Sequence, residues 1–263
     1  MNDSSNDIEA EARAVLERLA TPRRRARPRV SRALQEGSEH EIETPSGALS
    51  AWRVGEGPAV LMIHGWEDDN ALWGPLADRF AREARPVVVF DLPGHGFSHA
   101  TDASPAGVGI AALEVAKALG PIEAVVGHSY GCLSAIMAIA MGLKVESAVM
   151  IATPVPRTRP RTELRIDFEV SEAVYQRALE ISAEGETERA ERLEKTLRGM
   201  TAKALVIHSI DDEQTPVDNA YRLAELWPGA ELMLADELGH RFVAQDAAVL
   251  ERIVEFVEGY PPI

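Results

Sequence analysis

Apolar residues in this chain form short blocks, and the stretches between the blocks have apolar positions at helical spacing. Six blocks have the length of buried strands: Ala59–Ile63, Val87–Phe90, Ala124–Val126, Ala148–Ile151, Ala204–Ile207 and Glu231–Leu234. Five stretches between or after them have helical periodicity: Asn70–Ala84, Pro105–Leu119, Tyr130–Met141, Val217–Leu226 and Asp246–Glu258. Apolar strands that alternate with helices are typical of a parallel sheet covered on both faces. The pattern therefore predicts an α/β fold.

Two segments before this alternation predict a β-hairpin. Glu39–Thr44 and Ala48–Val54 are separated by Pro45-Ser46-Gly47, which is typical of a turn. With the hairpin, the predicted sheet has eight strands and is mostly parallel. Ligands bind beyond the carboxyl ends of the strands in such sheets, so the loops after the strands are where chemistry is expected.

Two regions lie outside the alternation. Ile8–Ala20 predicts an amphipathic helix, and a Pro/Arg-rich linker follows it. Pro154–Met200 separates two strands and contains two helix-like stretches. A structureless loop of that length would be unusual, so this segment is interpreted as a small helical lid. We expect an N-terminal helix and linker at 1–37, a core at 38–153 and 201–263, and a small helical lid at 154–200. The sequence leaves open whether the N-terminal helix covers the sheet or pairs with another subunit.

The composition is that of an ordinary globular domain. The 263 residues fit one large α/β domain at roughly 150 residues per domain, and 46% hydrophobic with 26% charged residues excludes a disordered chain or a coiled coil. The single cysteine, Cys132, cannot form an internal disulfide. The first residues lack the apolar core of a signal peptide, and no apolar run approaches the ~20 residues that span a bilayer. We therefore expect a cytoplasmic protein without a membrane partner.

The net charge of −15 argues against nucleic acid as a partner, because the chain repels phosphate backbones. One basic run stands out: Arg23, Arg24, Arg25, Arg27, Arg29 and Arg32. It has no aromatic residues among it, so a solvated, extended segment is favoured over a phosphate-binding arm. The charge also disfavours strongly anionic substrates, unless four lid arginines line the entrance: Arg157, Arg159, Arg161 and Arg165.

One strand-ending loop has the pattern of a nucleophile site. Gly127-His128-Ser129-Tyr130-Gly131 is a Gly-x-Ser-x-Gly element between an apolar strand and an Ala-rich helix. A nucleophile on such a sharp turn needs small neighbours, because a side chain at either glycine would collide with the turn. The helix N-terminus that follows also favours negative charge. Ser129 is therefore a candidate nucleophile.

A serine nucleophile needs a base that an acid orients, and both should follow strands that end at the same edge. The strand Ala204–Ile207 is followed by His208 and then by Asp211-Asp212, and the last strand is followed by Gly239-His240. The order Ser, Asp, His along the chain distinguishes one fold among the serine hydrolases.

On these residues the sequence resembles the α/β-hydrolase superfamily, from Glu39 to Glu258. The motifs that carry the resemblance are His64-Gly65, Asp91-Leu92-Pro93-Gly94-His95-Gly96-Phe97-Ser98, the Ser129 turn, Asp212-x-x-x-Pro216 and Gly239-His240. The resemblance implies that Ser129 is the nucleophile, His240 the general base and Asp212 the acid. Asp211 is the rival acid, and Asp212 is preferred because family members often place the acid a few residues before a proline.

The resemblance also implies an oxyanion hole made by backbone N–H groups, which map to Trp66 and Tyr130. The acidic run Glu67, Asp68 and Asp69 lies near His64, but no second histidine stands at ligand spacing. A solvated rim is therefore favoured there, and neither a metal nor another cofactor is expected.

The function that this resemblance implies is a serine hydrolase that cleaves a small or medium carboxylic ester through an acyl-enzyme intermediate. A serine nucleophile argues against the dehalogenase and epoxide-hydrolase branches, which attack with a carboxylate. An acyltransferase, a thioesterase, a lactonase, a carbon–carbon bond hydrolase and a cofactor-free haloperoxidase-like enzyme remain alternatives on the same site. A non-catalytic member of the fold that binds a small ligand is a further alternative. The oligomeric state is not predicted.

Overall fold

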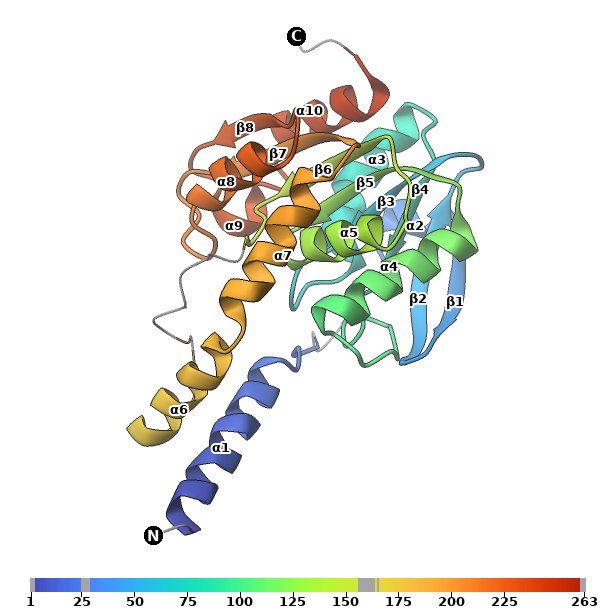
Figure 1. Ribbon diagram of the computed structural model, residues 1–263. Coiled ribbons are helices and arrows are strands. Elements are labelled where there is room, and N and C mark those ends of the chain that lie inside the picture. The colour runs from blue at the N-terminus through green and yellow to red at the C-terminus, as the bar shows by residue number, and fades with distance from the viewer. Residues whose placement is uncertain (1–2, 25–28, 156–163, 165, 261–263) are drawn as a thin grey trace.

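The computed structural model describes residues 3–24, 29–155, 164 and 166–260. One eight-stranded sheet with the order β1-β2-β4-β3-β5-β6-β7-β8 forms the centre of the molecule (Figure 1). The strands are β1 (Ser38–Thr44), β2 (Gly47–Val54), β3 (Ala59–Ile63), β4 (Val87–Phe90), β5 (Ile122–His128), β6 (Ser147–Ile151), β7 (Lys203–Ser209) and β8 (Glu231–Ala235). Strands β3 to β8 are parallel, and the β1–β2 hairpin adds to β4 in the antiparallel direction. The predicted α/β fold with a mostly parallel, eight-stranded sheet is confirmed.

The described part of the chain also contains helices at each position where periodicity predicts one. They are α1 (Asp3–Leu19), α2 (Arg32–Gln35), α3 (Gly74–Arg82), α4 (Pro105–Leu119), α5 (Tyr130–Ala140), α6 (Glu172–Ala183), α7 (Glu186–Arg198), α8 (Asp218–Leu226), α9 (Gly239–Phe242) and α10 (Ala247–Glu258), with a 3₁₀ helix η1 at Asn70–Trp73. The short α2 and α9 were not predicted, since four residues are too few for a periodic pattern.

The helix predicted at Asn70–Ala84 is in fact two elements. The carboxylate of Asp69 accepts a hydrogen bond from the N–H of Ala71 and begins η1. Pro75 then lies in the first turn of α3, where its missing N–H removes no helical hydrogen bond. The chain therefore restarts as an α-helix at Gly74 instead of continuing from Asn70.

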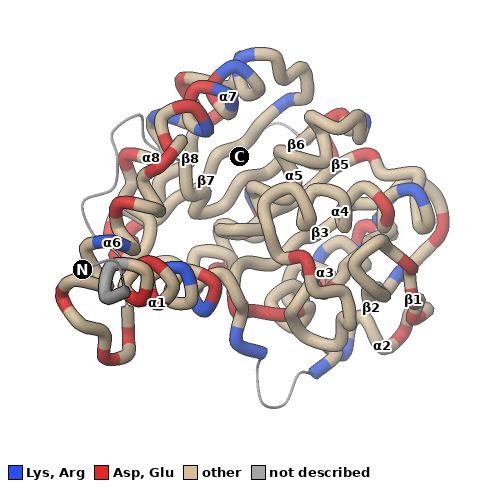
Figure 2. Tube along the Cα trace, turned by 60° about the horizontal axis from the view of Figure 1, so that its bottom comes forward, with Lys and Arg blue, Asp and Glu red and all other residues tan. Residues whose placement is uncertain are grey.

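Apolar clusters cover both faces of the sheet. All five residues of β3 are buried, and they alternate between the two clusters in the period of a strand. One cluster packs the sheet against α4, α5 and α8, and the other packs it against α3 and α10. Charged residues lie mainly on the outer helices and the hairpin, while the central strands carry few (Figure 2). Two buried faces explain why these strands are continuously apolar in sequence.

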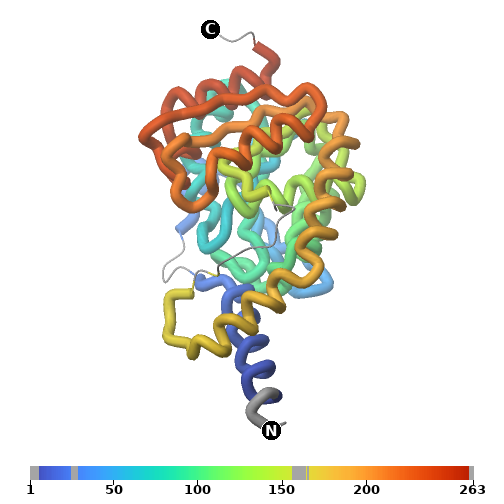
Figure 3. Tube along the Cα trace, turned by 60° about the vertical axis from the view of Figure 1, so that its left-hand side comes forward, coloured from blue at the N-terminus to red at the C-terminus, as the bar shows by residue number. Residues whose placement is uncertain are grey.

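The N-terminal helix α1 packs on α6 of the insert and does not cover the sheet. It lies beside α6, and the two helices project away from the sheet together (Figures 1 and 3). Ala12 and Val15 of α1 share a third apolar cluster with Val174 and Ala178 of α6 and with Leu164. The helices α6 and α7 thus account for the two helix-like stretches predicted in 154–200. The lid arginines Arg157, Arg159, Arg161 and Arg165 lie outside the described residues.

Among the described residues, no helix is long and apolar enough to cross a membrane.

Candidate active site

Ser129 stands on a strained turn between β5 and α5. Its backbone φ is 51°, which is rare for a residue with a side chain, and its N–H donates to the carbonyl of Ile151 on β6 over 2.8 Å. A Cβ at Gly127 would lie 2.8 Å from the backbone N of Cys132, and one at Gly131 would overlap the carbonyl oxygen of Ile63. The turn therefore requires glycine at both positions, as the motif predicts.

The structure brings the three predicted catalytic side chains together. His240 Nε2 lies 3.0 Å from Ser129 Oγ, and His240 Nδ1 lies 2.7 Å from Asp212 Oδ2. Both distances lie within the range of hydrogen bonds. The three residues come from the loops after β5, β7 and β8, whose carboxyl ends share one edge of the sheet. A serine and a carboxylate on opposite ring nitrogens is the arrangement that lets an imidazole take a proton from the hydroxyl.

Asp212 is fixed on both carboxylate oxygens. Its Oδ1 accepts the N–H groups of Gln214 and Thr215, each over 2.8 Å. Burial would raise the pKa of this carboxyl, but hydrogen bonds from His208, His240 and the Thr215 N–H outweigh burial and hold the pKa well below its usual range. The carboxylate therefore stays ionised next to the imidazole.

Asp211 does not contact His240. Its carboxylate instead accepts hydrogen bonds from the Ser209 hydroxyl and, over 3.1 Å, from the N–H of Gly239. Asp211 thus stabilises the turn that precedes His240, while Asp212 forms the hydrogen bond to the His240 ring.

His208 belongs to this site although the sequence pattern assigned it no role. It is fully buried at the end of β7, and its Nε2 donates to the carbonyl of Thr215 over 2.8 Å. The same nitrogen lies 3.4 Å from Asp212 Oδ2. The signal that could have found it is its place at a strand end, four residues before the acid on the same loop.

The two residues proposed as oxyanion donors pack against each other through their side chains. The rings of Trp66 and Tyr130 meet edge to face with centroids 5.2 Å apart. Within the described ranges, neither backbone N–H donates to another backbone or side-chain group. Tyr130 begins α5, where the first N–H groups have no partner in the helix. Neither group is thus used by a hydrogen bond within the described part of the protein.

Two contacts anchor the loop that carries His240. His128 Nε2 lies 2.8 Å from the backbone carbonyl of His240, and because that oxygen can only accept, Nε2 carries the proton. Burial lowers the pKa of His128 to about 4, so its ring is neutral at pH 7. Arg241, the next residue, forms a two-pronged ion pair with Asp68, with Nε 2.8 Å from Oδ2. These contacts join the His240 loop to the Ser129 turn and to the loop after β3.

The Gly-rich loop after β4 is organised by Asp91 and two histidines. Asp91 is buried and accepts the N–H groups of Asn70 and Phe97; burial raises its pKa to about 6. His64 accepts the N–H of Leu92 over 3.0 Å and so joins the loops after β3 and β4. His95 packs edge to face on both His64 and Trp66, so the Trp66 side chain contacts this loop.

The acidic run after Trp66 serves contacts within the protein. Glu67 pairs with Arg23, Asp68 with Arg241, and Asp69 caps η1. In the described part of the chain, no cluster of three or more His, Cys, Asp or Glu side chains could hold a metal ion.

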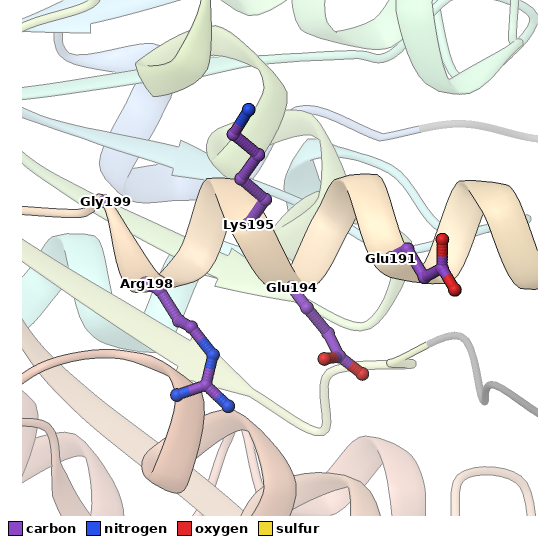
Figure 4. A pocket seen from close by; sticks show the side chains of 5 residues that line it. All are labelled: Glu191, Glu194, Lys195, Arg198 and Gly199. Atoms are coloured by element: carbon purple, nitrogen blue, oxygen red, sulfur yellow. The ribbon is translucent and has the colours of Figure 1, made fainter.

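A depression on the surface of α7 lies apart from these residues. Figure 4 shows its lining, which is Glu191, Glu194, Lys195, Arg198 and Gly199. It contains none of the predicted site residues, and Glu194 pairs with Arg222 of α8.

The chain is similar to known proteins in part of its sequence and in its fold. The chain is 38% identical to the pimeloyl-[acyl-carrier protein] methyl ester esterase of Xanthomonas campestris pv. campestris strain B100 over 99 residues. These 99 residues make up 38% of this chain and 38% of that relative. The match therefore spans well under half of that relative. This chain shares its fold with the esterase EaEST from Exiguobacterium antarcticum, with a TM-score of 0.65, 19% sequence identity and coverage of 84% of this chain and 100% of that one. The bromoperoxidase from Bacillus anthracis is similar to the same degree (TM-score 0.62, 16% identity, 84% and 100%).

The alpha/beta hydrolase family model matches residues 60–253, which includes every residue of the Ser129, Asp212 and His240 loops. This match covers most of the chain and both halves of the sheet. The chain therefore belongs to the alpha/beta hydrolase family.

Proposed function

We propose that this chain is a serine hydrolase that cleaves a carboxylic ester of small or medium size. The observation that carries the proposal is the position of His240, 3.0 Å from Ser129 Oγ on one side and 2.7 Å from Asp212 Oδ2 on the other. The roles are nucleophile for Ser129, general base for His240 and orienting acid for Asp212.

The proposed reaction has two halves. Ser129 Oγ attacks the ester carbonyl carbon and its proton passes to His240 Nε2, while the backbone N–H groups of Trp66 and Tyr130 bind the oxyanion. The tetrahedral intermediate then expels the alkoxide, which takes the proton from Nε2 and leaves as the alcohol. A water attacks the acyl-enzyme, gives a proton to Nε2, and the carboxylic acid leaves as Ser129 regains its proton.

Asp212 contributes throughout by position and charge. It keeps the proton of the neutral imidazole on Nδ1, so that Nε2 is free to accept one from Ser129. When the imidazolium forms, the ionised carboxylate stabilises it. The low pKa of Asp212 supports this role, because a protonated carboxyl would lose that charge.

The relatives support an ester as the substrate. The matched curated relative is named a methyl ester esterase, and the solved neighbours include esterases. We extend to this chain only the ester class and propose that the insert at 154–200 acts as a lid over the acyl group. Cytoplasmic location stays a prediction from the single, unpaired cysteine.

Labelling by a fluorophosphonate together with hydrolysis of p-nitrophenyl esters tests the proposal. Native protein should be labelled once and should release p-nitrophenol, and Ser129→Ala should do neither. Ser46→Ala, in the turn between β1 and β2 and outside the proposed site, is the matched control and should behave as native protein. No labelling of native protein, or equal labelling of Ser129→Ala, would overturn the proposal.

A further inference from the structure

The segment that joins α1 to the core lies against the loops that carry the site. The Pro22 ring packs on Gly94, where an added Cβ would lie 2.6 Å from Pro22 Cγ. Arg24 donates to the backbone carbonyls of Gly96 and Ser98 in the same Gly-rich loop. Residues 22–24, named here the arm, are therefore held on the core loop that contacts Trp66 through His95.

Arg23 extends from the arm in two directions. Its backbone N–H and its Nε both bind Glu67 Oε1, over 3.1 and 3.3 Å. Its terminal nitrogen lies 2.7 Å from Asp167, which precedes α6 in the insert. Glu67 follows Trp66 directly, so one side chain joins the proposed oxyanion loop to the proposed lid.

The other end of the N-terminal segment is attached to the insert. α1 packs its buried Ala12 and Val15 against Val174 and Ala178 of α6. Arg177 of α6 pairs with Glu9 of α1 over 2.6 Å, and Arg18 of α1 stacks over the ring of Phe168 at 3.7 Å. Exposed ion pairs contribute little singly, so the buried apolar contact is what holds α1 on α6.

The N-terminal segment is therefore fixed at both ends, on the insert through α1 and on the core loops through the arm. It also lies outside residues 60–253, the part that matches the family. We infer that this segment is a brace that holds the lid at a set distance from Ser129, and that Arg23 is a positioning residue for the acyl chain of the substrate. The inference rests on the proposed function and adds to it the element that determines chain-length selectivity.

The physical reason is that the core holds the insert at α7, through Leu197 and the Glu194–Arg222 pair, whereas the N-terminal segment holds it at α6. An insert held at both helices has less freedom than one held at α7 alone. A lid wall fixed near the site buries the distal part of an acyl chain and contributes to its binding. A short acyl group does not reach that wall. Loosening the brace should therefore weaken binding of longer esters and leave the chemistry at Ser129 unchanged.

The test is a charge-swap cycle read with p-nitrophenyl acetate and p-nitrophenyl octanoate. Arg23→Asp and Asp167→Arg each break the arm-to-insert pair. The double variant restores that pair with reversed charges, while the contact of the position-23 side chain with Glu67 stays broken, so its recovery should be partial. Because each charge reversal replaces an exposed attraction by a repulsion, we expect each single variant to raise KM for the octanoate about three- to fivefold, and to leave kcat for the octanoate and kcat/KM for the acetate within twofold. The double variant should recover at least half of the loss. Arg79→Ala, which removes an ion pair with Glu251 on the far helices, is the control.

A second variant tests the apolar end of the brace. Val15→Asp places a charge in the α1–α6 contact, while the clusters on the sheet are untouched. We expect the same loss of octanoate binding, and faster hydrogen–deuterium exchange in residues 66–69 and 166–171 than in native protein. An unchanged octanoate-to-acetate ratio in both single charge variants, or unchanged exchange in Val15→Asp, would overturn the brace.

These outcomes separate the brace from the proposed function. A native protein that neither hydrolyses the acetate nor reacts with the fluorophosphonate contradicts the serine hydrolase itself. Native hydrolysis with no effect of the brace variants contradicts only the brace. The exchange measurement needs no activity and tests the mechanical link in either case.

Discussion

His128 donates a hydrogen bond from Nε2 to the backbone carbonyl of His240 over 2.8 Å, so the residue before Ser129, the proposed nucleophile, holds the backbone of His240, the proposed base. The two rings lie with centroids 5.1 Å apart. The contact links the turn after β5 to the loop after β8, which are not neighbouring strands. The separation of Ser129 and His240 therefore depends on a neutral histidine that takes no part in the proposed chemistry.

Removal of that donor should slow the reaction without abolishing it. His128→Ala is expected to lower kcat for p-nitrophenyl acetate about 10- to 100-fold, because small displacements of a reacting group are costly. KM should change little, since the ester-binding groups remain. Steady-state kinetics measure the effect, with His40→Ala on the outer strand β1 as the control. A kcat equal to that of native protein would contradict the anchoring role.

Replacement of each neighbouring aspartate should separate their roles. Asp212→Asn keeps the shape but loses the charge and favours the wrong tautomer of His240, so kcat should fall about 10³- to 10⁴-fold. Asp211→Asn affects only the turn before Gly239 and should leave kcat within about tenfold of native. Kinetics on the same ester at pH 7 compare the two. A larger loss in the Asp211 variant would reverse the assignment.

A methyl group at Gly131 should destabilise the whole protein. The added Cβ would overlap the backbone carbonyl of Ile63 on the central strand β3, which cannot move without breaking the sheet. We expect Gly131→Ala to lose at least about 3 kcal/mol of unfolding free energy. At Gly199 the nearest atom to a Cβ is 3.5 Å away, so Gly199→Ala should be neutral or stabilise by up to about 1 kcal/mol. Urea unfolding of both variants measures the difference, and equal stabilities would count against the close packing of this turn.

Acid should destabilise the fold before most carboxylates titrate. Burial lowers the pKa of His95 and of His128 to about 4, whereas an unfolded histidine titrates near about 6.5. Between these pH values the unfolded chain binds more protons, so this contribution to stability is complete above about pH 6.5 and is lost as the pH falls to about 4.

Asp91 acts in the opposite sense over part of that window. Its pKa is raised to about 6, so its contribution is complete at low pH and is lost as the pH rises through about 6. Two histidines outweigh one carboxyl, so the net unfolding free energy should fall as the pH drops from 6 to 4.5, by on the order of 1 kcal/mol per pH unit. Urea unfolding at several pH values measures this slope. His95→Gln and His128→Gln should each flatten it, and a slope that neither variant changes would contradict the shifted values.

Much of the fold could be predicted from local pattern. Each strand and helix could be predicted from the residues within it alone. Strand β3 shows why: all five of its side chains are buried, so its sequence is apolar throughout. The turn at Ser129 was predictable from its motif, and the steric demand on Gly127 is local, since it comes from the backbone of Gly131 and Cys132, whereas the demand on Gly131 comes from the carbonyls of Ile63 and His64 at the end of the distant strand β3. The break between η1 and α3 was missed since it depends on how Asp69 caps the chain.

The tertiary structure decided what depends on contacts between distant segments. Asp211 and Asp212 are adjacent in sequence, and only the path of the loop after β7 sends one carboxylate to His240 and the other to Gly239. The pairing of His128 with the His240 carbonyl and the packing of α1 on α6 join residues more than a hundred positions apart. Local periodicity carries no information about such pairs. The sequence by itself thus determined the strands, the helices and the order of the reactive residues along the chain. Contacts between the loops at the carboxyl edge of the sheet determined which of these residues lie within hydrogen-bond distance of one another.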